Sequence, residues 1–202
     1  MEEIKDKLFN ILTNKDEFFS RSYFVLVKGG YKHDRGDVLY KSLDCGLELQ
    51  YKIDISDVMD GSNIIVFNKH VSNLEISQED FFEKAFQNTV KNLPAKLQSV
   101  CEMIDIDIFE DNFPLYCLTN SKMHFGAGAI LYPGIRERIE NIIGDFIVIP
   151  SSVHEVLLFP NTINLDDIRT TINEVNRTVL DEDDILSDKA YTLPLEGVLV
   201  EA

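Results

Sequence analysis

The sequence predicts an α+β fold, with a mainly antiparallel, twisted sheet and helices packed against it. Segments of strand and helix periodicity follow one another in mixed order along the 202 residues, without a repeating strand–helix–strand unit. The hydrophobic content of 45% is typical of a globular protein with a packed core. We expect a single domain over residues 1–202. It comprises an N-terminal helix at 1–17, a body at 18–192 and a loosely attached tail at 193–202.

The N-terminal residues carry an amphipathic helix signal. Ile4, Leu8, Ile11 and Leu12 recur at helical spacing with Glu and Lys between them. This pattern predicts a helix over residues 1–13 that packs on the body. The alternative is that this helix binds a partner or a second copy of the chain.

Strand and helix signals alternate over the next eighty residues. A β-rich run predicts a strand over 18–27, and alternation over 47–53 predicts a strand with one buried and one wet face. The turn signal at 60–63 joins this strand to an antiparallel partner at 64–67. Ser77 is the expected N-cap of a helix through Val90. Its expected inward face carries Phe81, Phe82, Ala85, Phe86 and Val90.

The remaining elements are predicted from apolar runs and from proline and glycine. They are a helix at 94–103, paired strands at 115–118 and 126–131, a helix at 133–143 ended by Gly144, buried strands at 145–149 and 156–159, and a helix at 164–178.

The segment between the two buried strands is the most plausible functional site. Ser152 and Glu155 match a capping box, so the simplest interpretation is a short helical turn. The alternative is a hydrolase with Ser152, or Ser151, as nucleophile, His154 as base and Glu155 as the residue that orients it. Neighbouring residues rarely face one another, and no glycine flanks either serine as in a nucleophile elbow, so we favour the structural interpretation.

The charge balance disfavours direct binding of nucleic acid or a membrane. With 19 basic and 35 acidic residues the formal charge is 19 − 35 = −16, at a pI near 4.5. Such a surface repels phosphates but suits a basic protein partner. The candidate interaction residues are the acidic run Asp181, Glu182, Asp183 and Asp184, and the acidic connection Asp105, Asp107, Glu110 and Asp111. The spacing of the connection does not match an EF-hand loop.

No cofactor or metal site is predicted. Cys45, Cys101 and Cys117 are far apart in apolar surroundings, which is typical of buried, reduced thiols. The four histidines are also isolated. No secretory leader and no bilayer-spanning apolar run is visible, so we expect a soluble, cytoplasmic protein.

Several short motifs together resemble an uncharacterised bacterial family, a domain of unknown function found in anaerobic Gram-positive bacteria and their mobile elements. The likeness covers roughly residues 18–191 and implies a shared fold without a known activity. The motifs are Asn68-Lys69-His70, Asn88-Thr89, Leu93-Pro94, Tyr116 to Asn120, Gly126-Ala127, Leu131-Tyr132-Pro133-Gly134, Pro150-Ser151-Ser152-x-His154-Glu155, Glu174 to Thr178 and Leu186-Ser187-Asp188.

Composition and resemblance together favour a non-enzymatic interaction or regulatory module. A sharper hypothesis is an anti-defence inhibitor from a mobile element, whose carboxylates stand in for nucleic-acid phosphates on a basic, nucleic-acid-binding target. The alternative from a different class is the small hydrolase built on Ser152, His154 and Glu155.

Overall fold

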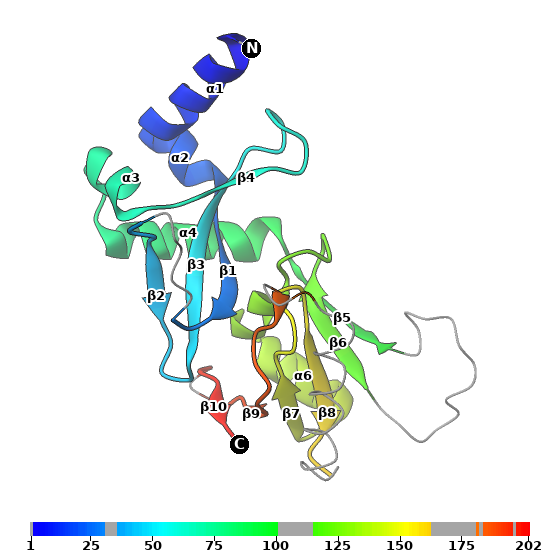
Figure 1. The fold of residues 1–202 in the computed structure, drawn as a ribbon. Coiled ribbons are helices and arrows are strands. Elements are labelled where there is room, and N and C mark those ends of the chain that lie inside the picture. Colours follow the sequence, from blue (N-terminus) through cyan, green and yellow to red (C-terminus); the bar gives the residue numbers. More distant parts are fainter. Residues whose placement is uncertain (1, 31–35, 101–114, 163–180, 182–183, 196) are drawn as a thin grey trace.

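The computed structural model describes residues 2–30, 36–100, 115–162, 181, 184–195 and 197–202. In this part of the chain, helices pack beside two antiparallel sheets (Figure 1). The α+β fold expected from the sequence is confirmed. The helix expected at 164–178 and the acidic connection at 105–111 lie outside the described residues.

The first sheet is built around β3 (Leu47–Asp54), which pairs along one edge with β1 (Ser22–Lys28). Its other edge pairs with β2 (Tyr40–Ser42) and with β4 (Asn63–Ile65). The antiparallel pair predicted on either side of the turn at 60–63 is therefore confirmed, with β4 shorter than expected.

Both faces of β3 are covered, so the prediction of one wet face is wrong. Gln50 and Lys52 lie on the face expected to meet solvent, and they are only 6% and 8% exposed. Phe125, from the segment that follows strand β6 (Tyr116–Asn120), covers this face: Lys52 Nζ lies 3.7 Å from its ring centroid. Connections of the second sheet thus bury the polar side of β3, which alternation within the strand does not reveal.

The opposite face of the first sheet packs on α4 (Gln78–Asn92), which crosses the strands in Figure 1. The predicted N-cap is confirmed, because Ser77 Oγ accepts a hydrogen bond from the backbone N–H three residues later at 3.1 Å. Phe81 is fully buried, and the ring of Phe86 stacks on Phe24 of β1 with centroids 5.4 Å apart. The predicted inward face of this helix is therefore correct.

Two N-terminal helices precede the first strand, α1 (Glu2–Thr13) and α2 (Lys15–Arg21). The first is confirmed. The prediction of a strand beginning at Phe18 is wrong, because this residue lies in α2. Asn14 caps that helix by accepting hydrogen bonds from the N–H groups two and three residues later. Phe18 is instead a fully buried helical residue. A further short helix, α3 (Asn68–Asn73), lies between β4 and α4.

The second sheet has the strand order β10-β9-β7-β8-β6-β5. Its central hairpin is formed by β7 (Phe146–Ile149) and β8 (Val156–Pro160), which confirms the two buried strands expected there. β6 (Tyr116–Asn120) pairs with β8, and β5 (Ala95–Ser99) pairs with β6.

The helix predicted over 94–103 is wrong in its described part, because residues 95–99 form β5. The pairing with β6 places Leu97 opposite Leu118, a fully buried residue. Cross-strand packing of this kind overrides a weak local helix signal.

The strand predicted over 126–131 is also wrong, because Ala127–Leu131 form the 3₁₀ helix η1. Small residues let this segment approach a side chain of β1 closely. A Cβ added to Gly128 would lie 2.6 Å from an atom of the Phe24 ring. The following helix, α6 (Ile135–Ile143), ends as expected at Gly144, whose φ is +81°.

The C-terminal residues, expected to form a loosely attached tail, are anchored to the second sheet. β9 (Tyr191–Thr192) pairs with β7, and β10 (Val200–Glu201) pairs with β9. Between them, Leu199 is 2% exposed. Tyr191 also reaches the first sheet, since its hydroxyl donates to the carbonyl of Cys45 at 3.4 Å.

The two sheets share one hydrophobic core. A single cluster of buried side chains includes Phe24 and Tyr51 from the first sheet and Leu118, Val148 and Leu158 from the second. In the described ranges, no helix has both the length and the apolar composition needed to cross a bilayer.

Candidate functional site

The serines singled out in the sequence lie in the connection between β7 and β8 and are buried, Ser151 at 6% and Ser152 at 1% exposure. The predicted helical turn is wrong: Ser152 forms an antiparallel bridge with Ile185, which holds this backbone extended. Ser152 Oγ accepts a hydrogen bond from the backbone N–H of His154 at 2.9 Å. The serine thus stabilises a tight turn of a different kind from the expected capping box.

His154 is held by contacts on both ring nitrogens. Its Nδ1 accepts a hydrogen bond from the backbone N–H of Phe125 at 3.2 Å, so its proton lies on Nε2. That Nε2 faces Asp184 Oδ1 at 3.6 Å. Among the described residues, the imidazole of His154 therefore makes no hydrogen bond to a serine hydroxyl, which the hydrolase hypothesis requires.

The backbone of His154 also links separate elements. Its carbonyl accepts from Thr119 Oγ1 at 2.7 Å and from the N–H of Gly126 at 3.0 Å. These bonds connect the β7–β8 turn to β6 and to the segment before η1. They explain the Ser152–His154 motif structurally, and a hydrolase built on Ser152, His154 and Glu155 stays a prediction.

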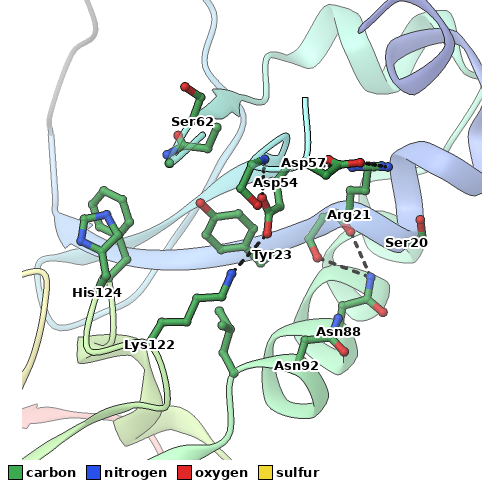
Figure 2. Close-up of a pocket in the computed structure, with 16 residues that line it drawn as sticks. Ser20, Arg21, Tyr23, Asp54, Asp57, Ser62, Asn88, Asn92, Lys122 and His124 are labelled. Atoms are coloured by element: carbon green, nitrogen blue, oxygen red, sulfur yellow. Dashed lines mark hydrogen bonds and ion pairs between the residues drawn. The ribbon is translucent and has the colours of Figure 1, made fainter. Parts of the chain in front are cut away.

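A cavity of about 400 Å³ lies elsewhere, where the two sheets meet. Figure 2 shows its walls: the end of α2 and start of β1, the β3–β4 connection, the end of α4, and the segment after β6. Its labelled side chains are polar or charged and come from residues scattered from 20 to 124. Volumes of this size are typical of sites for small molecules.

One wall of the cavity holds an ion pair with further hydrogen bonds. Arg21 binds Asp57 through two hydrogen bonds of 2.6 and 3.1 Å, and two more of its N–H groups donate to Glu17 at 3.0 Å and to the carbonyl of Asp54 at 3.3 Å. The hydrogen bond from Arg21 holds the pKa of Asp57 below its usual range, and the same bond raises the pKa of Arg21. Both groups remain charged over the whole physiological range.

A second ion pair spans the cavity and is much more open. Lys122 Nζ, on the segment after β6, lies 3.4 Å from Asp54 Oδ2 at the end of β3, and the side chains are 60% and 38% exposed. Burial raises the pKa of Asp54, but hydrogen bonds from Ser56 and the charge of Lys122 outweigh it and hold the pKa below its usual range. This carboxylate is therefore ionised at neutral pH.

Other polar groups of the cavity have no partner. Within the described part of the chain, the side chains of Tyr23, Asn63 and Asn92 make no hydrogen bond to protein. Burial and the nearby Asp54 carboxylate raise the pKa of Tyr23, so its hydroxyl keeps its proton and can donate. The cavity thus offers both charged and neutral hydrogen-bonding groups to a ligand.

A cluster of basic groups lies beside the cavity. The rings of His124 and His154 stack with centroids 4.9 Å apart, and Lys52 lies over Phe125. Burial lowers the pKa of Lys52 to about 8, and burial together with His154 and Lys52 lowers the pKa of His124. Burial thus shifts Lys52 and His124 towards their neutral forms.

The remaining predicted site residues are described only in part. Asp181 is exposed, whereas Asp184 is half-buried against His154. Glu182, Asp183, Asp105, Asp107, Glu110 and Asp111 lie outside the described residues. An acidic interaction surface formed by these residues therefore stays a prediction.

Two of the three cysteines lie in the described part of the chain. Cys45 and Cys117 are free, and burial raises the pKa of Cys117 to about 11, which keeps it a thiol. Cys101 lies outside the described residues. In the ranges that the structure describes, no three His, Cys, Asp or Glu side chains gather as metal ligands.

Sequence reasoning missed the cavity. Its charged residues Arg21, Asp54 and Asp57 stand at the ends of elements, where isolated charges are common, and their spacing matches no ligand-binding motif. The available signal was the polar Asp54-Ile55-Ser56-Asp57 segment directly after a buried strand.

Fold and site together define an α+β protein with two antiparallel sheets, one shared core and a polar cavity at their junction. The chain belongs to a family of unknown function, DUF5688, whose model matches residues 45–193. Asp54, Asp57 and Lys122 lie within the matched segment, whereas Arg21 and Tyr23 precede it. Among curated proteins and solved structures, none matches this chain.

Proposed function

We propose that the protein is a non-enzymatic interaction module that engages a basic protein partner through its acidic surface. The observation that carries this proposal is the excess of acidic over basic residues, 35 against 19. A surface of this charge attracts basic partners over long distances and accelerates their association.

Helix α1 supplies an exposed apolar side chain that can anchor a partner, in addition to the acidic charge. Phe9 is 69% exposed, although its helix is held to the body through Ile11, which is buried. By helical periodicity Phe9 shares its outer face with Glu2 and Asp6, both exposed. Exposed aromatic side chains at the centre of a polar rim are typical of the residues that dominate binding energy. In Figure 1, α1 extends away from the sheets, which leaves this face accessible.

A finer form of the proposal concerns the kind of partner. A nucleic-acid-binding protein presents a basic surface shaped to receive phosphates, and carboxylates can occupy the same positions. The acidic run Asp181 to Asp184 is the proposed mimic, as in an anti-defence inhibitor. This form rests on the net charge of −16 and predicts competition between the protein and nucleic acid for the same partner.

The test is affinity capture from host lysate with four forms of the full chain: wild type, two variants and a control variant. We expect wild type to retain a basic protein in low salt. The single variant Phe9→Ala and the triple variant Asp181→Asn/Glu182→Gln/Asp183→Asn should each retain at least tenfold less of that protein. Ile142→Ala is the matched control, because Ile142 is also an exposed apolar residue on a helix, at 53% exposure.

Two results would contradict the proposal. Equal retention by wild type and by both variants would show that neither the aromatic anchor nor the acidic run binds the partner. If added duplex DNA or RNA left the captured protein in place, the nucleic-acid-mimic form would be wrong, while the general interaction role would stand.

A further inference from the structure

The cavity at the junction of the sheets carries an inference independent of the interaction role. Its walls come from the first sheet, from α2 and α4, and from the segment after β6, and the Lys122–Asp54 ion pair connects the two sides across the opening. Clefts between packed units, with a few convergent polar groups, are the usual positions of small-molecule sites (Figure 2).

The two ion pairs of the cavity differ in their availability to a ligand. Arg21 is engaged in four hydrogen bonds, and its side chain is only 25% exposed. Lys122 and Asp54 make a single long contact of 3.4 Å, and the lysine is 60% exposed. An exposed pair of this kind contributes little to stability, so a ligand can separate it at small cost.

The charges select a ligand that carries both signs. An anion would find Lys122 but would leave Asp54 unpaired in a protein of net charge −16. A cation would pair with Asp54 and leave Lys122 without its partner. A zwitterion replaces one ion pair by two, because its ammonium takes the place of Lys122 and its carboxylate the place of Asp54.

Neutral groups around the pair can hold the rest of such a ligand. Tyr23, Asn63 and Asn92 offer a hydroxyl and two amides that have no protein partner in the described residues. Leu93 and Phe125 add apolar surface beside them. A cavity of about 400 Å³ is large enough for an amino acid and its side chain.

We propose that this cavity binds a free α-amino acid, with its ammonium group on Asp54 and its carboxylate on Lys122. The side chain of the ligand then lies against Leu93 and Phe125. Tyr23, Asn63 and Asn92 contribute to the choice among amino acids, because unpaired polar groups reject ligands that cannot satisfy them.

The experiment titrates the full chain with each of the twenty L-amino acids by isothermal titration calorimetry. For the tightest ligand, the same titration uses the amine that lacks its carboxylate and the acid that lacks its ammonium. We expect saturable one-to-one binding of at least one amino acid, and at least tenfold weaker binding of both truncated analogues.

Variants connect the binding to the proposed residues. Asp54→Asn and Lys122→Met should each weaken the same amino acid at least tenfold, whereas Lys41→Met, at an exposed position of β2, should leave its affinity unchanged. Circular dichroism establishes that each variant is folded. If Asp54→Asn fails to fold, Lys122→Met carries the test, because Lys122 is exposed.

Three outcomes would overturn the proposal. In the first, none of the twenty amino acids shows saturable binding up to 10 mM. In the second, Lys122→Met binds the amino acid with the affinity of the wild type. In the third, the amine analogue binds as tightly as the intact amino acid. The last result would identify a cation site on Asp54. None of them bears on partner capture through Phe9, so the two proposals fail separately.

Discussion

At the scale of single residues, Lys52 is the most unusual side chain of the described structure. It is 8% exposed, and its ammonium lies 3.7 Å from the centre of the Phe125 ring. Among the described residues, no carboxylate lies within ion-pair distance of it. Burial therefore lowers its pKa from 10.5 to about 8.

Replacing Lys52 with methionine should stabilise the protein at neutral pH. A shift from 10.5 to about 8 corresponds to a cost of about 3 kcal/mol, of which the aromatic contact returns on the order of 1 kcal/mol. We expect Lys52→Met to raise the free energy of unfolding by about 1–3 kcal/mol at pH 7, measured by urea unfolding. Lys41→Met, an exposed lysine, should change it by less than about 0.5 kcal/mol.

The stability gained by Lys52→Met should decrease as the pH rises. Between pH 8 and 10.5 the unfolded chain binds the Lys52 proton and the folded chain does not, so the stability of the wild type rises with pH. The advantage of the methionine variant is full below pH 8 and declines towards pH 10.5. An equal difference between the two proteins at pH 7 and pH 9.5 would disprove this assignment.

At the scale of elements, the segment between β6 and η1 is fixed by a close backbone approach at Gly126. A Cβ added there would lie 2.5 Å from the amide nitrogen of Asn120 and 2.7 Å from the carbonyl oxygen of His154, and closer still to Thr119 Oγ1. Backbone atoms cannot move aside as flexible side chains do. This approach positions Lys122, His124 and Phe125 at the cavity.

Substituting Gly126 with alanine should therefore destabilise the protein by about 1–3 kcal/mol, measured by urea unfolding. Gly61→Ala is the control for backbone conformation alone, since Gly61 has φ +66° and no atom within 4 Å of an added Cβ. It should cost about 1 kcal/mol. If Gly126→Ala destabilises the protein no more than Gly61→Ala does, the close backbone approach at Gly126 is contradicted.

The elements also show how far the sequence predicts this fold. Strong local signals were sufficient for α4, with Ser77 as cap and Phe81 inward, and for the β7–β8 hairpin. Predictions were wrong where a distant partner decides the conformation, as for β5 beside β6 and for η1 against Phe24. Helix and strand propensities are weak where tertiary contacts compete with them.

The cavity was unpredictable for a similar reason. Asp54 and Lys122 are 68 residues apart, and their pairing depends on how the second sheet docks on the first. By contrast, the Ser152–His154 motif was predicted as the candidate site because its polar residues lie between two apolar runs. The structure gives them turn and hydrogen-bonding roles, which local sequence alone does not separate from catalytic ones.

At the scale of the whole molecule, β3 links the N-terminal residues to the rest of the fold. The family model begins at Cys45, two residues before this strand. β1, which pairs along one whole edge of β3, and β2, which pairs with part of the other, both precede that point. Phe24 of β1 also lies in the shared core.

A chain shortened to residues 45–202 should consequently be insoluble when it is expressed. An eight-residue strand with one bare edge and a core without Phe24 favour aggregation. A chain starting at Asn14 keeps the cap of α2 and loses from the core the buried Ile11 and the partly buried Leu8 and Leu12, so it should remain folded. Soluble yield and circular dichroism compare the two, and a folded 45–202 fragment would contradict the expectation. For work on this protein, the unit to clone is therefore longer at its N-terminal side than the segment by which its family is recognised.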